Sequence, residues 1–426
     1  MEEALIHKRK PTSIPSQSST SSSSNAISAT LEMDCRLWSK LPQTLIDRVI
    51  VFLPPPAFVR ARSVCKRWCG LLFTSDFLEM YLRISPRHHW FLFFKVDQSF
   101  SKSYIYKNNG GIDNNSKDSC EGYLYDPKER TWYRLPFETI PSGFFPASSS
   151  GGLVCWVSHN LGPKSLILSN PMIKAFVRLP LTLQPRLFPS VGLVSNDLSL
   201  KVVVAGDDLI SEFSVKNLSS ESFHVDNVGF YSMWGTKCEL PRLCSLESGR
   251  MVYFNGRFYC MDYNPFNVLV YDTVANSWSK IDAPMKRFLR SPSLVECRGR
   301  LMLVAAVEKS KLNVPKSLRF WRLEVPRSSW MEVERMPQQL YLQFVEAEGG
   351  KGFDCAGHGD FIVVTIHGSD QILVNDFYKK VWEWIPQCPF ISGSSIGGGL
   401  CCFAYEPRAV TPGMVLLEQS TFSLLT

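Results

Sequence analysis

The segment Asp272-Thr273-Val274-Ala275-Asn276-Ser277-Trp278-Ser279-Lys280-Ile281 decides the fold class of this chain. An aspartate in this position starts a tight turn, because its side chain accepts a hydrogen bond from the backbone two residues further on. Trp278 then opens the next strand and packs inward, and Ile281 begins the apolar alternation of that strand. A single segment of this kind predicts a β-hairpin. The fold follows from its repetition.

Five other segments repeat the spacing of turn residue, aromatic residue and apolar residue. Two are close copies, Asp126/Trp132/Leu135 and Asp376/Trp382/Ile385, and three are softer: Asn170/Phe176/Leu179, Glu324/Trp330/Val333 and Asn217/Phe223, the last without its apolar residue. The six aromatic positions are separated by 44, 47, 55, 52 and 52 residues. Units of this length with strand and turn signals are typical of four-stranded propeller blades. The repeats therefore predict a mainly β fold, a kelch-type β-propeller of six blades within residues 85–426, with seven blades as an alternative.

A propeller has to pair its last strand with its first blade, because open edges at both ends would remain unpaired. The apolar segment from Leu400 to Tyr405 is the candidate for this role. We expect it to pair into the opening blade near Phe91.

Residues 34–84 differ from the repeats, because their apolar residues have the spacing of short helices. Pro42 suits the first turn of a helix, and five apolar residues then recur on one helical face: Leu45, Ile46, Val49, Ile50 and Leu53. Pro54-Pro55-Pro56 is expected to end this helix, and further helical stretches follow around Trp68 and from Ser75. A module this small usually needs a partner to cover its remaining apolar surface.

The rest of the composition limits the class of protein. Residues 1–33 are a tail in which nine of the sixteen residues from Ser13 to Ser28 are serine, and such a segment is expected to be disordered. No apolar run approaches the ~18 residues of a membrane helix. The 13 cysteines are odd in number and form no CxxC pair, and the seven histidines form no HExxH motif. We therefore predict an intracellular protein with no metal, no cofactor, no small-molecule substrate and no contact with a membrane.

The net charge of +7 is concentrated in one part of the chain. Residues 286–322 contain ten Lys and Arg against two Glu, and the other 389 residues sum to −1. The segment from Lys309 to Arg319 is predicted to be a loop between strands. A basic loop of this kind can bind phosphates through the release of counterions. The candidate nucleic-acid-binding residues are Lys309, Lys311, Lys316 and Arg319, and the alternative is a solvated basic face.

Several motifs resemble those of a known family. Leu41-Pro42, the stripe ending at Leu53 and the run Val64-Cys65-Lys66-Arg67-Trp68 resemble the F-box. With a propeller behind it, the chain resembles the plant F-box/kelch-repeat proteins. Runs such as Ala205-Gly206-Asp207-Asp208-Leu209-Ile210 and Lys309-Ser310-Lys311-Leu312-Asn313-Val314-Pro315-Lys316 resemble a subgroup of that family that controls floral meristem and organ identity.

The resemblance implies a non-catalytic adaptor subunit of an SCF-type ubiquitin ligase, in which the F-box binds a Skp-type adaptor and, through it, a cullin. In the floral subgroup the propeller binds the transcription factor LEAFY and acts as a transcriptional cofactor at DNA, which implies a location in the nucleus and also in the cytoplasm. Carried over by position, the adaptor contact involves Leu41, Pro42, Leu45, Ile46, Leu53, Val64, Cys65, Lys66, Arg67 and Trp68. Leu45, Val49 and Val64 could equally belong to the core of the module itself.

Two other functions remain open at this point. One is a pure ubiquitin-ligase substrate receptor whose partner is degraded and which makes no DNA contact. The other is a propeller enzyme, whose sign would be a cluster of inward polar side chains holding an ion in the channel. Long insertions usually carry the binding loops, which favours residues 227–250 and 306–320 as the partner-binding segments.

Overall fold

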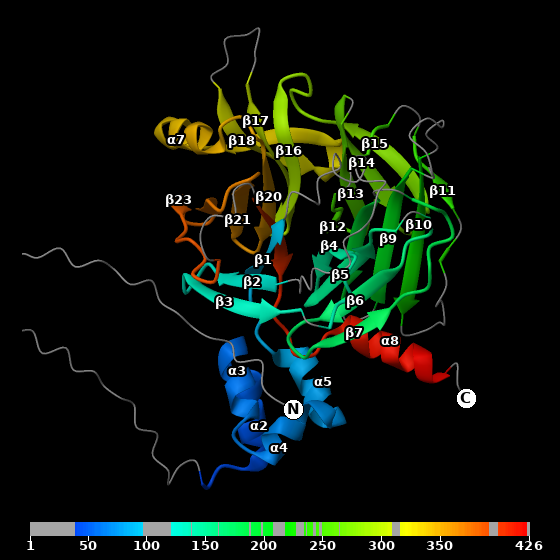
Figure 1. Cartoon of the computed structure of the whole chain (residues 1–426), viewed down its shortest axis with the longest axis vertical. Helices are drawn as coiled ribbons and strands as arrows, with labels where there is room; N and C mark the ends of the chain where they lie inside the picture. Colours follow the sequence, from blue (N-terminus) through cyan, green and yellow to red (C-terminus); the bar gives the residue numbers. More distant parts are fainter. Residues whose placement is uncertain are drawn as a thin grey trace, which may run out of the picture. The chain divides into compact units, whose positions relative to one another are not determined.

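The structure is a computed structural model, shown in Figure 1, that describes most of the chain after residue 38. It describes residues 39–96, 121–207, 218–226, 234–308, 316–391 and 399–423, apart from residues 138, 161, 187–188, 197–198, 236, 242–243, 247–248 and 264. The described residues form two compact units that divide between Arg87 and His88. The predicted serine-rich tail lies outside the described residues.

The first unit is a group of short helices. They are α2 (Gln43–Val51), α3 (Pro55–Arg62), α4 (Lys66–Gly70), the 3₁₀ turn η1 (Leu71–Phe73) and α5 (Ser75–Ile84). Helix α2 ends at Val51, just before the three prolines as predicted, but Pro55 and Pro56 then begin α3, where the missing N–H of proline costs nothing. The core of this unit consists of Ile50, Val51, Phe58, Ala61, Leu71, Phe77 and Tyr81.

The second unit is a β-propeller. In the described part of the chain its strands form six four-stranded sheets, which confirms the prediction of six blades. Blade 1 contains β24 (Gly399–Tyr405), β1 (Trp90–Val96), β2 (Glu121–Asp126) and β3 (Thr131–Pro136). Blade 2 contains β4 (Phe144–Ser150), β5 (Leu153–Ser158), β6 (Leu166–Asn170) and β7 (Ala175–Arg178). Blade 3 contains β8 (Ser190–Ser195), β9 (Ser199–Asp207), β10 (Leu218–Asp226) and β11 (Cys238–Glu239).

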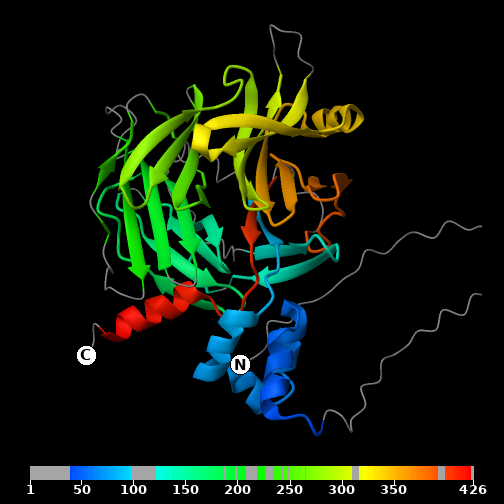
Figure 2. The same ribbon diagram turned by 180° about the vertical axis from the view of Figure 1, so that it is seen from behind.

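The remaining blades follow in chain order, and Figure 2 shows the sheets gathered around one axis. Blade 4 contains β12 (Val252–Phe254), β13 (Arg257–Tyr263), β14 (Phe266–Asp272) and β15 (Ser277–Asp282). Blade 5 contains β16 (Leu289–Cys297), β17 (Arg300–Val307), β18 (Ser317–Glu324) and β19 (Ser329–Arg335), with the 3₁₀ turn η3 (Val325–Arg327) before β19. Blade 6 contains β20 (Phe353–His358), β21 (Phe361–Ile366), β22 (Ile372–Asp376) and β23 (Val381–Trp384).

The ring closes through the strand that the sequence indicated. β24 pairs antiparallel with β1, from Trp90 opposite Tyr405 to Val96 opposite Gly399. A segment near the end of the sequence thus supplies the innermost strand of blade 1. The predicted closure near Phe91 is confirmed, because Phe91 lies opposite Ala404.

In several blades a tryptophan joins the blade to the preceding one. The indole N–H of Trp132 donates to the Pro386 carbonyl oxygen at 3.0 Å, and that of Trp330 donates to the Asp282 carbonyl oxygen at 3.0 Å. In blade 3 this role belongs to Trp234, which donates to the Pro180 carbonyl oxygen at 2.8 Å. The predicted sixth copy at Phe223 is therefore wrong, because Phe223 lies in the third strand of its blade, β10, and not in the fourth. The predicted turn residue Asn217 lies outside the described residues.

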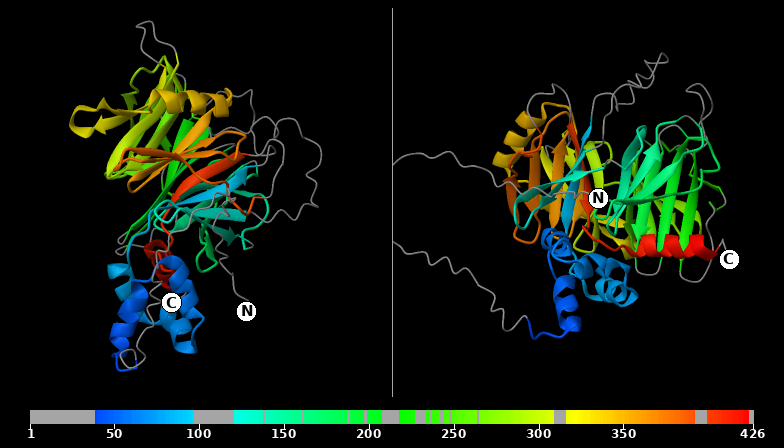
Figure 3. Two further views of the ribbon diagram at one scale, coloured as in Figure 1. Left: turned by 90° about the vertical axis from the view of Figure 1, so that its left-hand side faces the viewer. Right: turned by 60° about the horizontal axis from the view of Figure 1, so that its bottom comes forward.

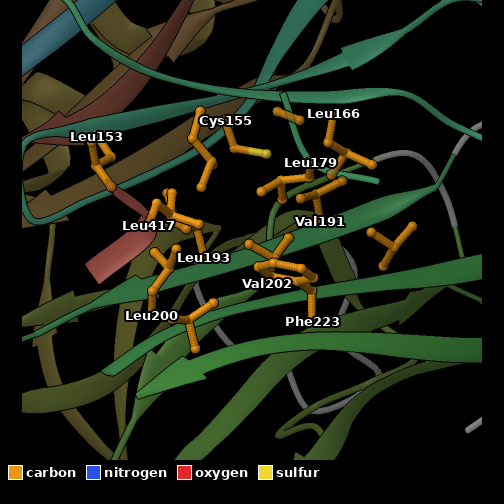
Figure 4. Close-up of a cluster of buried hydrophobic side chains, with 14 of the residues drawn as sticks. Leu153, Cys155, Leu166, Leu179, Val191, Leu193, Leu200, Val202, Phe223 and Leu417 are labelled. Atoms are coloured by element: carbon orange, nitrogen blue, oxygen red, sulfur yellow. The ribbon is translucent and has the colours of Figure 1, made fainter. Parts of the chain in front are cut away.

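Apolar clusters fill the spaces between adjacent blades. Figure 4 shows the cluster between blades 2 and 3, which contains Leu166 and Val191 together with Val202 and Phe223. Helix α8 (Pro412–Ser423) adds Met414, Leu416 and Leu417 to this cluster and lies against β9 and β10 (Figure 3). A second helix, α7 (Gln338–Glu348), joins blades 5 and 6 and buries Tyr341 and Phe344 against them.

Candidate functional site

An apolar stripe is exposed along α2 and the residue that follows it. Leu45, Val49 and Phe52 are 45%, 42% and 50% exposed, and their spacing places them on one helical face. Together with Leu41 and Arg48 they line an open hollow of about 400 Å³. Three large apolar side chains exposed on one face form a surface suited to contact with a partner.

The structure decides which apolar residues of the helical unit are core and which are surface. Leu45, Val49 and Val64 are exposed, Val64 at 67%, so they do not belong to the core of the unit. Ile50, which was predicted on the same face as Leu45, is 2% exposed and packs inside. The stripe is therefore narrower than the predicted one and points away from the core.

The ten predicted adaptor-binding residues all lie at least partly on the surface. Pro42, Leu45, Val64, Cys65, Lys66 and Arg67 are exposed, and Leu41, Ile46, Leu53 and Trp68 are half-buried. Val49 and Phe52 were not among them. Their positions four and seven residues after Leu45 are the signal that could have added them to the set.

Two of the ten residues also hold the short helix α4 in place. The Arg67 guanidinium donates to both carboxylate oxygens of Asp47 on α2, at 2.7 and 2.6 Å. The Cys65 sulfur accepts the backbone N–H of Trp68 at 3.4 Å and so caps α4. Because exposed ion pairs contribute at most about 1 kcal/mol, the Asp47–Arg67 pair orients α4 more than it stabilises the unit.

The predicted basic loop lies between β17 and β18. Lys309 and Lys311 lie outside the described residues. Lys316 is exposed, and no carboxylate in the described part of the chain forms an ion pair with it. The placement of Arg319 in the loop is wrong, because Arg319 lies in β18 opposite Ala305 and is 2% exposed. Its guanidinium donates to the Ser317 hydroxyl at 2.9 Å and to Glu332 at 3.3 Å, so it cannot contact DNA.

Much of the positive charge around this loop is compensated. Five of its cations form ion pairs with carboxylates: Lys286 with Asp282, Arg290 with Glu308 and Glu348, Arg298 with Asp360, Arg319 with Glu332 and Arg322 with Glu324. The net charge of +8 therefore overstates the positive electrostatic potential of this blade, because several of the carboxylates that pair with these cations lie outside residues 286–322. In the described part of the cluster, Arg287, Arg300 and Lys316 are exposed and form no ion pair with a carboxylate.

The axis of the propeller is crossed by an arginine. Arg250 precedes β12 and donates to the carbonyl oxygens of Cys355 in blade 6, at 3.1 Å, and Cys402 in blade 1. Its guanidinium also lies 5.1 Å from the centre of the Phe403 ring. The described residues contain no group of three or more His, Cys, Asp or Glu side chains that could hold a metal ion. Nor do they include a helix with the length and apolar character needed to cross a membrane.

The comparisons with known proteins agree with this architecture. Residues 38–79 match the F-box domain, and residues 124–348 match the KIB1-4 beta-propeller. The chain is 56% identical to Protein UNUSUAL FLORAL ORGANS of Arabidopsis thaliana, over 91% of this chain and 89% of that protein. It is 41% identical to Protein ABERRANT PANICLE ORGANIZATION 1 of Oryza sativa subsp. indica, over 93% and 94% of the two chains.

These matches confirm the resemblance on which the F-box expectations were based. The propeller match is described as KIB1-4 and not as kelch, so the kelch-type label stays a prediction. An F-box domain implies a non-catalytic receptor subunit that binds a Skp-type adaptor, and the propeller is suited to a protein partner. The chain belongs to the plant family of F-box proteins with a β-propeller that includes UNUSUAL FLORAL ORGANS and ABERRANT PANICLE ORGANIZATION 1.

Proposed function

We propose that this protein is the substrate receptor of an SCF-type ubiquitin ligase and that its propeller brings a LEAFY-type transcription factor to the complex, acting as a transcriptional cofactor at DNA in the nucleus. The observation that carries the proposal is the exposed stripe of Leu45, Val49 and Phe52. A stripe of this kind on a domain that matches the F-box is the surface for the Skp-type adaptor.

Burial of the stripe supplies part of the free energy of docking, and the rest has to come from other contacts of the unit. Full burial of a Leu, Val or Phe side chain contributes about 1.5–3 kcal/mol. Since each of the three is already about half buried, covering the rest contributes roughly 2–4 kcal/mol in total. A charge introduced into this stripe would have to lose its hydration on docking, so it should abolish the contact.

The test is co-purification of the full chain with a Skp-type adaptor and a cullin. Val49→Asp and Phe52→Asp should each prevent co-purification without unfolding the chain, because both side chains are exposed. The matched control is Val274→Asp, an exposed valine (90%) in a turn of blade 4, which should bind the adaptor normally. If both stripe variants bound the adaptor as well as the control, the stripe would not be the adaptor surface.

The finer part of the proposal concerns LEAFY and DNA. It is supported by the name of the Arabidopsis relative, which refers to floral organs, and by the exposure of Lys316 at the end of the loop that also contains Lys309 and Lys311. Each phosphate contact contributes a slope of about −0.9 to a plot of log affinity against log salt. Replacing Lys309, Lys311 and Lys316 with alanine should therefore flatten that slope by up to about 2.7 for the ternary complex of this chain, LEAFY and DNA.

The control for that experiment keeps the change in net charge the same. Lys128, Lys379 and Lys380 are exposed lysines in the turns of blades 1 and 6, and their triple alanine variant should leave the slope unchanged. Adaptor binding should be unaffected in both triple variants. An unchanged ternary complex at physiological salt in the loop variant would exclude this loop as the DNA contact.

A second function is favoured by the compensated charge around the loop. With Arg319 buried and five cations of the cluster paired, a pure ligase receptor that degrades its partner without touching DNA is also consistent with the surface. Deleting residues 38–82 and measuring promoter activation with LEAFY separates the two. Activity that is retained indicates a cofactor role independent of degradation, whereas activity that is lost favours the pure receptor.

A further inference from the structure

A small polar pocket lies between blades 3 and 4. Its volume is about 100 Å³, and it is lined by Lys201, Val203, Ser222, Phe223, His224, Tyr271 and Thr273. None of these residues belongs to the helical unit or to the basic loop. The lining contains two basic side chains, three hydroxyl groups and no carboxylate.

The pocket results from strand alternation and from the register of β9 and β10. Leu200 and Val202 point into the cluster between blades 2 and 3, as Figure 4 shows, so Lys201 between them points toward blade 4. Lys201 lies directly opposite His224 on β10, which places both basic side chains on the same face. On that face, Val203 and Ala205 further along β9 are buried against Phe258 and Tyr271 of blade 4. On this face of the blade, Lys201 and His224 are therefore basic, whereas the next positions along β9 are apolar.

The lysine is oriented but not neutralised. Its Nζ donates to the Thr273 hydroxyl at 3.4 Å, and that hydroxyl donates in turn to the Gly256 carbonyl oxygen at 2.9 Å. An ammonium group has three donors, so two remain available for a ligand. Across the parts of the chain that the structure describes, Lys201 has no carboxylate partner.

The opposite wall of the pocket is also fixed. The Tyr271 hydroxyl donates to the Asn276 side-chain oxygen at 2.7 Å, which holds the phenol ring against the pocket. The turn that contains Thr273 is fixed because the Asp272 carboxylate accepts the N–H groups of Val274 and Ala275, both at 3.0 Å. The groups that would surround a ligand are thus in place before it binds.

We propose that this pocket binds the phosphate group of a phosphorylated serine or threonine on a partner protein. The proposal deepens and rests on the proposed receptor function, because it specifies the chemistry by which the propeller recognises a partner. A phosphomonoester carries a charge of about −1.5 to −2 and three strong acceptor oxygens, which suits two free ammonium donors beside an imidazole. A volume of about 100 Å³ has room for one tetrahedral anion but not for a nucleotide.

The shape of the pocket favours a protein phosphate over the DNA backbone. A phosphomonoester has one substituent, so its three free oxygens can enter a small pocket while the peptide stays outside. A backbone phosphodiester has a sugar on both sides and only two free oxygens. It suits an open basic surface such as the lysine loop of blade 5.

The test uses the full chain in complex with its Skp-type adaptor. O-phosphoserine, inorganic phosphate and serine are titrated by calorimetry at constant ionic strength, and we expect binding of the first two and not of serine. Lys201→Met, which keeps the aliphatic stem of the lysine, should weaken phosphoserine binding by about tenfold or more, since a charge-assisted hydrogen bond is lost. His224→Gln should weaken it by a smaller factor, and the control Lys128→Met, an exposed lysine in a turn of blade 1, should bind as the unaltered chain does.

A second measurement needs no variant. In the unaltered complex, phosphoserine should protect Lys201 from acetylation by an amine-reactive reagent, read by mass spectrometry, and should leave Lys128 reactive. Equal phosphoserine affinity of Lys201→Met and the unaltered chain, or no protection of Lys201, would overturn the proposal. Protection of Lys201 by a short DNA duplex but not by phosphoserine would assign the pocket to nucleic acid and would also overturn it. Adaptor binding by Lys201→Met separates this result from a failure of the proposed function, because the stripe on α2 lies in the other unit.

Discussion

Replacing Glu221 with glutamine tests how the connection between blades 2 and 3 is held. The side chains of Glu221 and Arg186 are both fully buried, and they form an ion pair at 2.9 Å. Arg186 also donates to the carbonyl oxygens of Gly206 and Ser219, at 2.9 and 2.7 Å. Glu221 in turn accepts the backbone N–H groups of Leu183 and Gln184, at 2.6 and 3.0 Å. One ion pair thus fixes the segment that leaves blade 2 onto two strands of blade 3.

Glu221→Gln should lower the free energy of unfolding, because it leaves the charge of Arg186 buried without its partner. Removing one partner of a buried pair leaves the other charge uncompensated, and this typically costs 3–5 kcal/mol. The glutamine amide group also replaces one of the two acceptor oxygens with a donor, so one of the two N–H groups loses its partner. Since a domain is stabilised by only about 5–15 kcal/mol, the substitution should remove about a fifth or more of the stability of the propeller.

The assay is equilibrium urea unfolding of the full chain, followed by the fluorescence of its tryptophans. The double variant Arg186→Met, Glu221→Leu removes both charges and should be more stable than either single variant, because no unpaired charge remains. A loss below about 1 kcal/mol for Glu221→Gln would contradict this reasoning. A double variant whose loss equals the sum of the two single losses would contradict it as well, since it would show that the two residues do not interact.

Three further predictions concern other parts of the molecule. In the helical unit, Ile50→Ala should lower the free energy of unfolding by about 2–5 kcal/mol, whereas Leu45→Ala should cost less than about 1 kcal/mol, measured by thermal unfolding; equal losses would refute the division into core and stripe. Trp234→Phe should cost about 1 kcal/mol by removing the indole donor to the Pro180 carbonyl oxygen, and urea unfolding compared with Trp132→Phe should give similar losses if both tryptophans hold adjacent blades. The hydrogen bond to Asp354 at 3.1 Å raises the pKa of His367 above its usual 6.5, so the stability that the pair contributes is present below about pH 6.5 and is lost as the pH rises through the folded pKa. The difference in Tm between the unaltered chain and His367→Asn should accordingly shrink from about pH 6 to about pH 8, a range in which histidine titrates. A constant difference would show that the pair with Asp354 does not stabilise the fold in this way.

The propeller could be predicted largely because its repeats are local in sequence. The turn-and-tryptophan spacing and the closing strand depend on residues within one hairpin or on one apolar run. The prediction from this spacing was wrong in blade 3, where β11 has two residues and pairs only with Ser219 and Ser220. Without a regular fourth strand, the correct tryptophan, Trp234, has no turn residue at the usual offset, and Phe223 took its place in the prediction.

The candidate sites were predictable only in part, for a related reason. Alternation along Ser317–Glu324 shows that Leu318 and Phe320 face one side, but not that the other side is also buried. The sequence therefore predicts Arg319 to be an exposed cation of the loop. In the structure it forms an ion pair with Glu332 on the next strand, β19. The pocket around Lys201 was beyond prediction, because it requires both the register of β9 with β10 and the packing of blade 4 against that face.

The closure of the ring sets the order in which this protein can assemble. The helical unit has a core of its own within residues 39–87, so this core can form as soon as those residues have been synthesised. Blade 1 needs β24, and its pairing of Trp90 with Tyr405 spans almost the whole propeller sequence. Contacts of such long range form slowly, because the loop between them must be closed before the pairing stabilises anything. Until then the edge of β1 is open and its aromatic residues are exposed. The unit that carries the adaptor stripe is therefore expected to be complete before the unit that selects the partner.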